Sequence, residues 1–150
     1  MKTNFIIILT SLVLLILLPS FNDEKTENFS LTIQVKDLRN SKGVVQFALY
    51  NKDGSVPDEH YTKYFRISKG KITNNSSVVT FDNLPQGKYA VNILHDENSN
   101  GKIDKGFVLP KEGIGFSNYM DFGITNRPNF TKSSFDLKGD LKIIVSIIYM

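Results

Sequence analysis

The sequence predicts a single all-β domain, an antiparallel β-sandwich of about seven strands. Apolar and polar residues alternate with a period of two in several short segments. Segments rich in Gly, Pro, Asn and Asp separate these runs, and no long segment has the period of a helix. The chain has 150 residues, which is enough for one domain with a hydrophobic core.

The N-terminus has the pattern of a secretory signal. Met1 and Lys2 precede an apolar run over 5–18, which is shorter than the ~20 residues needed to span a bilayer. We expect a signal peptide over 1–20, a disordered lead-in over 21–28 and the β-sandwich domain over 29–150. The protein would then be exported to the periplasm, the cell surface or the medium, with no membrane span after signal cleavage. The alternative is an uncleaved N-terminal anchor.

Alternation predicts the first strands. Leu31, Ile33 and Val35 alternate with polar residues, as do the side chains of 45–50, and the turn-like segment 37–43 between them predicts a hairpin. The segment 51–60 contains Asp-Gly and Pro and is expected to be a loop. The segment 61–68 fits either a short strand or a helical turn.

A second pair of strands is predicted around Leu-Pro-Gln-Gly at 84–87. Residues 77–81 form one strand, and Tyr89, Val91 and Ile93 lie on one face of the next. This arrangement resembles the hairpin of prealbumin-like and carboxypeptidase-regulatory-like modules. The resemblance implies an immunoglobulin-like or prealbumin-like sandwich.

The C-terminal third is expected to contain two more strands. Residues 133–137 are expected to form a short one. In the last strand one face carries Ile143, Val145, Ile147 and Tyr149, and the other carries Ile144 and Ile148. A strand that is apolar on both faces is either central in its sheet or covered by a partner. The glycines in the segment 111–118 allow close approach of another backbone.

The loop that follows the Tyr89–Ile93 strand resembles a calcium-binding loop. Its side chains occupy positions one, three, five and nine of such a loop, and Gly101 stands at position six, where the chain turns sharply. A backbone carbonyl serves at position seven, and waters or an outside carboxylate such as Glu112, Glu97 or Asp121 would complete the oxygen shell. The candidate metal ligands are therefore Asp96, Asn98, Asn100, Lys102 through its carbonyl, Asp104 and Glu112.

The match to the EF-hand pattern is partial. Phe107 stands at position twelve, where that motif has a bidentate Glu, and no helix signal flanks the loop. Asp, Asn and Gly are also the residues of ordinary turns, so a metal-free turn is the alternative interpretation. His95 precedes the loop and is expected to pack or hydrogen-bond at its base, while His60 is expected to be solvated.

Composition excludes several classes of function. The formal net charge is +3, and no basic stripe indicates nucleic-acid binding. The absence of Cys excludes disulfides and a lipid-modified N-terminal Cys. The sequence contains no catalytic constellation: it has no cysteine, no paired histidines and no nucleophile with a base at motif spacing. Ser117 is not in a nucleophile elbow, because Tyr119 stands where that motif has its second Gly.

The chain resembles a family of secreted bacterial proteins defined as a domain of unknown function, DUF2141. The resemblance covers roughly 29–149 and rests on several strings: Leu38-Arg39-Asn40 with Lys42-Gly43, Leu84-Pro85 with Gly87-Lys88-Tyr89-Ala90, His95-Asp96-Glu97-Asn98 with Asn100-Gly101-Lys102-Ile103-Asp104, Pro110 with Glu112-Gly113, Gly115-Phe116-Ser117-Asn118, and the final aliphatic strand that ends in Tyr149. The family often has Gly-x-Pro before the Glu-Gly pair, where this chain has Val108-Leu109-Pro110. The resemblance implies export and a compact β-sandwich, and it supplies no activity.

These observations favour a non-enzymatic exported module. We expect it to bind Ca²⁺ in the Asp96–Asp104 loop and to present a surface to a glycan or protein of the cell envelope. One alternative is a metal-dependent enzyme that uses His95, Asp96, Asp104 and Glu112. Another is a purely structural subunit with a metal-free turn that pairs through its last strand.

Overall fold

The computed structural model describes residues 27–107, 109–119, 121 and 126–150. The predicted signal peptide and all but the end of the predicted lead-in lie outside the described residues. In chain order the elements are β1 (Asn28–Val35), β2 (Val44–Tyr50), β3 (Arg66–Gly70), β4 (Ser77–Pro85), β5 (Gly87–Asp96), β6 (Gly113–Phe116), the single-turn α2 (Phe130–Ser133), β7 (Phe135–Leu137) and β8 (Leu141–Val145). The prediction of an all-β chain is confirmed.

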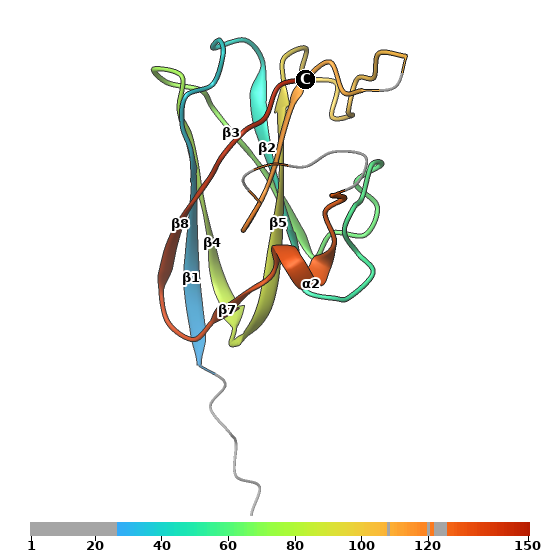
Figure 1. Ribbon diagram of the computed structural model, residues 1–150. Coiled ribbons are helices and arrows are strands. Elements are labelled where there is room, and N and C mark those ends of the chain that lie inside the picture. Colours follow the sequence, from blue (N-terminus) through green and yellow to red (C-terminus); the bar gives the residue numbers. More distant parts are fainter. Residues whose placement is uncertain (1–26, 108, 120, 122–125) are drawn as a thin grey trace, which may run out of the picture.

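The strands form two sheets (Figure 1). The small sheet has the order β4-β1-β8, and the large sheet has the order β3-β2-β5-β6. β7 pairs with the first residues of β5, along the same edge that β6 occupies further on. All these pairs are antiparallel except β1 with β8, which run parallel. The expectation of a purely antiparallel arrangement is therefore wrong at this pair, because the chain re-enters the small sheet at the end where β1 begins.

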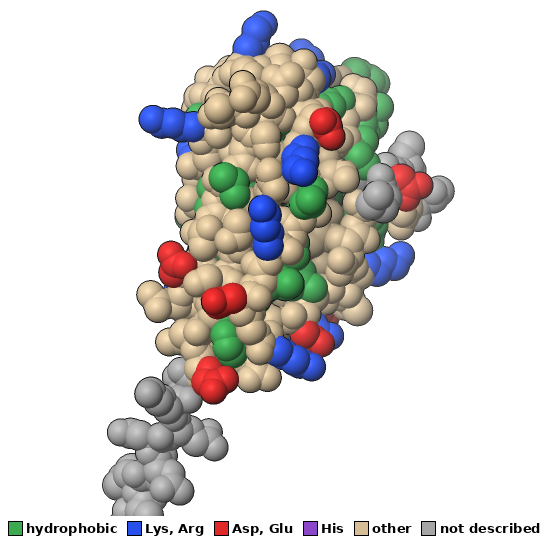
Figure 2. Space-filling model, turned by 90° about the vertical axis from the view of Figure 1, so that its left-hand side faces the viewer, with side chains coloured by type: hydrophobic (Ala, Val, Ile, Leu, Met, Phe, Trp, Pro, Cys, Tyr) green, Lys and Arg blue, Asp and Glu red, His purple; other side chains and the backbone are tan. Residues whose placement is uncertain are grey.

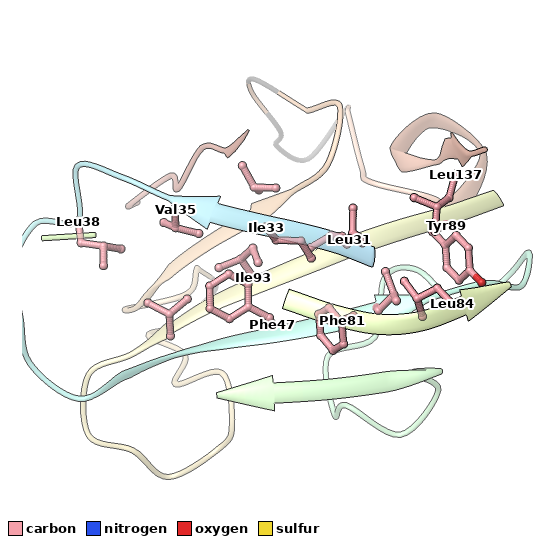
Figure 3. Close-up of a cluster of buried hydrophobic side chains, with 14 residues drawn as sticks. Leu31, Ile33, Val35, Leu38, Phe47, Phe81, Leu84, Tyr89, Ile93 and Leu137 are labelled. Atoms are coloured by element: carbon pink, nitrogen blue, oxygen red, sulfur yellow. The ribbon is translucent and has the colours of Figure 1, made fainter. Parts of the chain in front are cut away.

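One hydrophobic core lies between the sheets. Side chains of β1 and of the large sheet point toward one another in Figure 3. Leu31, Ile33 and Val35 of β1 are fully buried against Phe47 and Ile93 of β2 and β5. Their period of two is the signal that predicted these strands, because alternate residues of a strand share one face.

A second apolar cluster covers the other face of the large sheet. Leu94 on β5 and Ile114 on β6 pack there with Val56 and Tyr61 from the connection between β2 and β3 and with Phe130 of α2. β5 is consequently buried on both sides, and every residue from Tyr89 to Asp96 is buried. The outer face of the small sheet, by contrast, carries scattered charged and apolar side chains (Figure 2).

Two predicted hairpins are wrong. β1 and β2 lie in different sheets, since β1 pairs with β4 and β2 pairs with β5. The Leu-Pro-Gln-Gly segment also joins strands of different sheets, because β4 belongs to the small sheet and β5 to the large one. Leu84 and Tyr89 flank this corner, and both are buried in the core between the sheets. The corner is therefore held by side-chain burial and not by pairing of the two strands that it connects.

The last strand is neither central nor uniformly buried. β8 is an edge of the small sheet, and Ile144 is 59% exposed. After Val145 the chain crosses to the large sheet, where Ile148 and Ile114 exchange two backbone hydrogen bonds of 2.8 and 3.0 Å. This crossing extends the edge of the large sheet beyond β6. Among the described residues, no helix has the length and hydropathy that a membrane span requires.

The C-terminal segment approaches β6 closely. A Cβ at Gly115 would lie 2.3 Å from the carbonyl oxygen of Ser146, and one at Gly113 would lie 2.4 Å from the ring of Tyr149. The predicted close backbone approach is confirmed. It places Tyr149 at the end of the molecule where the Asp96–Asp104 loop begins.

Candidate functional site

The Asp96–Asp104 loop is folded around its own backbone N–H groups. Asp96 is fully buried at the end of β5, and its carboxylate accepts hydrogen bonds from the backbone of Asn100 at 2.9 Å and Gly101 at 2.7 Å. Gly101 has φ of +77°, the left-handed conformation that glycine adopts without strain. Lys69 Nζ lies 4.0 Å from the Asp96 carboxylate. The sharp turn predicted at Gly101 is confirmed.

Three of the predicted ligands converge inside the loop. The Asn98 side-chain amide donates to Asp104 at 2.6 Å, and the Asn100 amide donates to the other oxygen of that carboxylate at 3.1 Å. The Oδ1 of Asn98 accepts from the backbone N–H of Asn100, and that of Asn100 accepts from the N–H of Lys102. The side chains of positions three, five and nine therefore meet, while their oxygens already have N–H partners.

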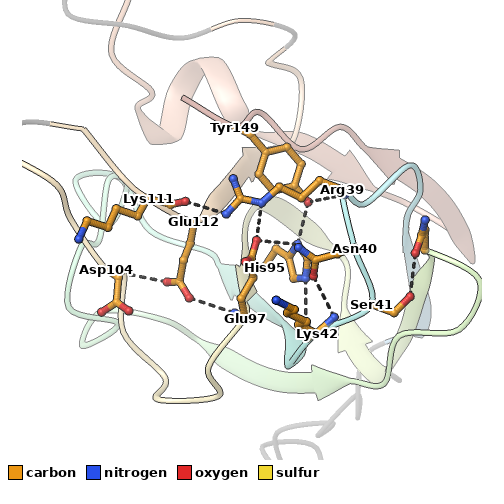
Figure 4. A network of polar contacts seen from close by, with 11 residues as sticks. Arg39, Asn40, Ser41, Lys42, His95, Glu97, Asp104, Lys111, Glu112 and Tyr149 are labelled. Carbon is orange, nitrogen blue, oxygen red and sulfur yellow. Dashed lines mark hydrogen bonds and ion pairs between the residues drawn. The ribbon is translucent and has the colours of Figure 1, made fainter.

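Glu112 closes the loop from outside. One of its carboxylate oxygens accepts from the N–H of Glu97 at 2.9 Å, and the other accepts from the N–H of Asp104 at 3.1 Å. Glu112 is 4% exposed, and this burial raises the pKa of its carboxyl above the ordinary value. Glu112 therefore binds both ends of the loop at once (Figure 4).

A second set of polar contacts holds the base of the loop (Figure 4). His95 is fully buried; its Nδ1 lies 2.7 Å from the Tyr149 hydroxyl and its Nε2 lies 3.0 Å from the carbonyl oxygen of Lys42. A carbonyl only accepts hydrogen bonds, so Nε2 carries a proton and the Tyr149 hydroxyl can donate to Nδ1. The expectation that His95 hydrogen-bonds at the loop base is confirmed.

Arg39 joins the loop to the C-terminal segment. Its Nε binds Glu97, its Nη2 donates to the carbonyl of Lys111 at 2.9 Å, and its guanidinium lies 4.7 Å from the centre of the Tyr149 ring. The hydrogen bond from Arg39 is the main cause that lowers the pKa of the Glu97 carboxyl. Segments distant in sequence thus meet around one loop.

The predicted residues come together only in part. Asp96, Asn98, Asn100, Asp104 and Glu112 all lie in or against the loop, and the backbone of Lys102 is held by Asn100. Within the described part of the chain, no group of three or more His, Asp or Glu side chains is close enough to hold a metal ion. A cation at this loop would therefore depend on amide and backbone oxygens as well as carboxylates.

Arg39 and Tyr149 belong to this site although no sequence pattern predicted them there. Both are distant from the loop in the sequence, and no local pattern connects them to it. Arg39 lies in the connection between β1 and β2, and Tyr149 was expected only to share a face of the last strand with Ile147. The strings that carry the family resemblance include both residues, in Leu38-Arg39-Asn40 and in the final strand that ends in Tyr149, and they were the available signal.

The family comparison covers both the core strands and the loop. The model of a family described as an uncharacterized protein conserved in bacteria, DUF2141, matches residues 33–144. No curated protein and no solved structure matches the chain. The matched segment is more than half of the sequence and includes β2 to β7, the Asp96–Asp104 loop and Glu112. The chain therefore belongs to the DUF2141 family of bacterial proteins.

Proposed function

We propose that the protein is a non-enzymatic, exported binding module with an immunoglobulin-like or prealbumin-like sandwich. Its Asp96–Asp104 loop holds a calcium-like cation and stiffens a surface for a glycan or protein of the cell envelope. The observation that carries this proposal is the convergence of Asn98, Asn100 and Asp104, whose side chains meet within 2.6–3.1 Å. Export rests on the signal pattern of residues 1–20.

The donor set suits a hard cation. Carboxylate, amide and carbonyl oxygens are the groups that calcium prefers. Rotation of the Asn98 and Asn100 amides away from Asp104 would free its carboxylate for the ion, and Lys102 could add its carbonyl. With few carboxylates we expect a dissociation constant of about 10⁻⁴ to 10⁻³ M. At a tenfold excess over that constant, binding stabilises the fold by about 1.4 kcal/mol.

The environment of His95 supports a non-enzymatic role. Its ring is fully buried, and both ring nitrogens face protein atoms, the Tyr149 hydroxyl and the Lys42 carbonyl. Glu112 likewise uses both carboxylate oxygens for backbone N–H groups. Asp96 and Asp104, the other two residues of the proposed metal-dependent enzyme, also accept hydrogen bonds within the loop. All four residues therefore have structural partners, which favours the binding module over the enzyme.

A metal-free structural loop is the second candidate. It is favoured because the hydrogen bonds of Asp96, Asn98, Asn100 and Asp104 already satisfy the loop without an ion. In that case the loop is a rigid cap on the end of the large sheet. Thermal unfolding of the variants Asp104→Asn and Asp53→Asn distinguishes the two candidates.

The test is thermal unfolding with and without millimolar calcium. Asp104→Asn keeps the shape of the side chain and removes its charge, while Asp53→Asn alters an exposed carboxylate in another loop and serves as the matched control. We expect calcium to raise the melting temperature of the unaltered protein and of Asp53→Asn, and to have little effect on Asp104→Asn. If calcium leaves the melting temperature of all three proteins unchanged, or raises it equally in all three, the cation site is contradicted and the metal-free loop is the better account.

A further inference from the structure

A cleft opens on the outer face of the large sheet, beside the Asp96–Asp104 loop. Its volume is about 280 Å³, and Asn92 on β5 and Phe116 on β6 lie among its lining residues. Loop residues complete it, among them Pro57, Ile103, Leu109 and Arg127. Ligand sites of proteins are concave and mostly apolar, with a few placed polar groups. This volume, just below the usual range of about 300–1,000 Å³, suits a molecule the size of one amino acid.

We propose that this cleft binds a small amphipathic carboxylate of the N-acylated apolar amino acid type. Such a molecule combines an apolar side chain, an amide N–H and a carboxylate. Each of these three groups has a complementary feature in the cleft.

The hydrogen-bonding feature is Asn92. This residue is 1% exposed and lines the cleft, and its Oδ1 has no hydrogen-bond partner within the part of the chain that the structure describes. A buried carbonyl oxygen without a partner costs about 1–3 kcal/mol, so such groups are normally satisfied by protein, water or ligand. An amide N–H of the ligand supplies the donor that Asn92 lacks.

The apolar feature is the wall around Asn92. Ile114 and Phe116 contribute from β6, and Ile103, Leu109 and Pro128 contribute from the loops. Leu109 is 48% exposed although it is apolar. A ligand that covered this wall would remove the apolar surface from water, which is the main driving force of such binding.

The charged feature is Arg127 at the cleft. Of the three other charged lining residues, Glu59 and Lys105 are bound to each other. The third, Asp58, accepts hydrogen bonds from the Tyr50 hydroxyl at 3.2 Å and from the backbone N–H of Lys63 at 2.8 Å. Among the ion pairs of the described residues, none involves Arg127. The Tyr119 hydroxyl donates to the carbonyl oxygen of Arg127 at 3.0 Å, which holds the backbone of this residue in place. The charge of Arg127 acts on the nearby Glu59 carboxylate, but no ion pair joins these two residues. A carboxylate of the ligand would fit the planar fork of this guanidinium.

The cleft proposal rests on the proposed function in one respect, because both assume that the outer face of the large sheet is a binding surface. It does not require the cation. Ile103 and Lys105 at the end of the loop line the cleft, so an ion in the loop would steady one wall, whereas Asn92, Phe116 and Arg127 lie outside the loop.

The experiment is a titration of N-acetyl-phenylalanine into the ¹⁵N-labelled protein, followed by NMR and run with and without calcium. We expect saturable shifts centred on the backbone amides of Asn92, Ile114, Phe116 and Arg127. N-acetyl-phenylalaninamide, which lacks the carboxylate, and the variant Arg127→Gln should each weaken binding about fivefold, as expected for an exposed ion pair. Lys132→Gln, an exposed cation on α2 outside the cleft lining, is the matched control and should bind normally.

The variant Asn92→Leu tests the buried amide. We expect it to weaken binding about three- to tenfold, the effect of one hydrogen bond. The free energy of unfolding should change little, because removal of the unsatisfied Oδ1 offsets the loss of the side-chain hydrogen bond with Tyr50. Loss of binding together with loss of stability would assign Asn92 to the fold alone and overturn its role. No saturable shift, or equal binding of the acid and the amide, would overturn the ligand class. Binding that persists without calcium would support the cleft even if the cation proposal fails.

Discussion

The Tyr149 hydroxyl lies 2.7 Å from Nδ1 of His95, a residue 54 positions earlier in the chain. This contact joins the end of the chain to the base of the Asp96–Asp104 loop. Because the same hydroxyl also accepts the backbone N–H of Arg39 at 3.2 Å, one phenol group connects three segments. The loop is therefore positioned by the C-terminal segment as well as by β5.

Removal of this hydroxyl should destabilise the protein. In Tyr149→Phe the buried Nδ1 of His95 loses its partner, and we expect the free energy of unfolding to fall by about 1–3 kcal/mol. Urea unfolding measures this change. Tyr64→Phe is the control, since Tyr64 is 42% exposed and its hydroxyl makes no hydrogen bond among the described residues. Equal stability of the two variants would show that the contact at His95 contributes nothing.

Gly115 should not tolerate a methyl group. Gly115→Ala places a Cβ 2.3 Å from the carbonyl oxygen of Ser146, so the C-terminal segment must move away from β6. We expect a loss of about 1–3 kcal/mol, the range of overpacking in a filled interior. Gly139→Ala is the matched control because a Cβ there meets no atom within 4 Å. Denaturant unfolding of both variants makes the comparison, and a Gly115→Ala protein as stable as the control contradicts the close approach.

Two carboxylates near the loop should affect stability with opposite dependence on pH. Burial raises the pKa of Glu112 in the folded state, so its stabilising contribution is present at low pH and is lost as pH rises through that raised pKa. The Arg39 hydrogen bond lowers the pKa of Glu97, so its contribution is present above the ordinary pKa and is lost as pH falls.

The measurement is the free energy of unfolding from about pH 3 to about pH 7, for the unaltered protein, Glu112→Gln and Glu97→Gln. The stability of the unaltered protein relative to Glu112→Gln should decrease as pH rises. Relative to Glu97→Gln it should increase. Parallel pH profiles for the two variants would contradict the different environments of these carboxylates.

Local pattern predicted the strands but not their partners. The alternation of Leu31, Ile33 and Val35 identified β1, because side chains on one face of a strand are buried together. The same alternation carries no information about pairing, so β1 was assigned to β2 and its parallel partner β8 was not foreseen. β6 was missed because Gly-Ile-Gly-Phe is short and half of its residues have no side chain to give a pattern.

The loop was predictable to a similar extent. The spacing from Asp96 to Asp104 identified a turn at Gly101, and Glu112, one of three carboxylates expected to complete the loop, lies beside it. The two hydrogen bonds that Glu112 accepts from backbone N–H groups were not predictable. Sequence spacing does not indicate which donors lie near a carboxylate in the folded chain. Arg39, Tyr149 and the cleft at Asn92 depend on contacts between distant segments, which only the folded chain brings together.

The most direct test of the proposed function is a calorimetric titration of calcium into protein stripped with chelator. The proposal predicts saturable binding to one site with a dissociation constant of about 10⁻⁴ to 10⁻³ M, lost in Asp104→Asn and retained in Asp53→Asn. An absence of binding heat at millimolar calcium, with no rise in melting temperature, would contradict it. The Asp96–Asp104 loop would then be a metal-free turn held by Asp96 and Glu112.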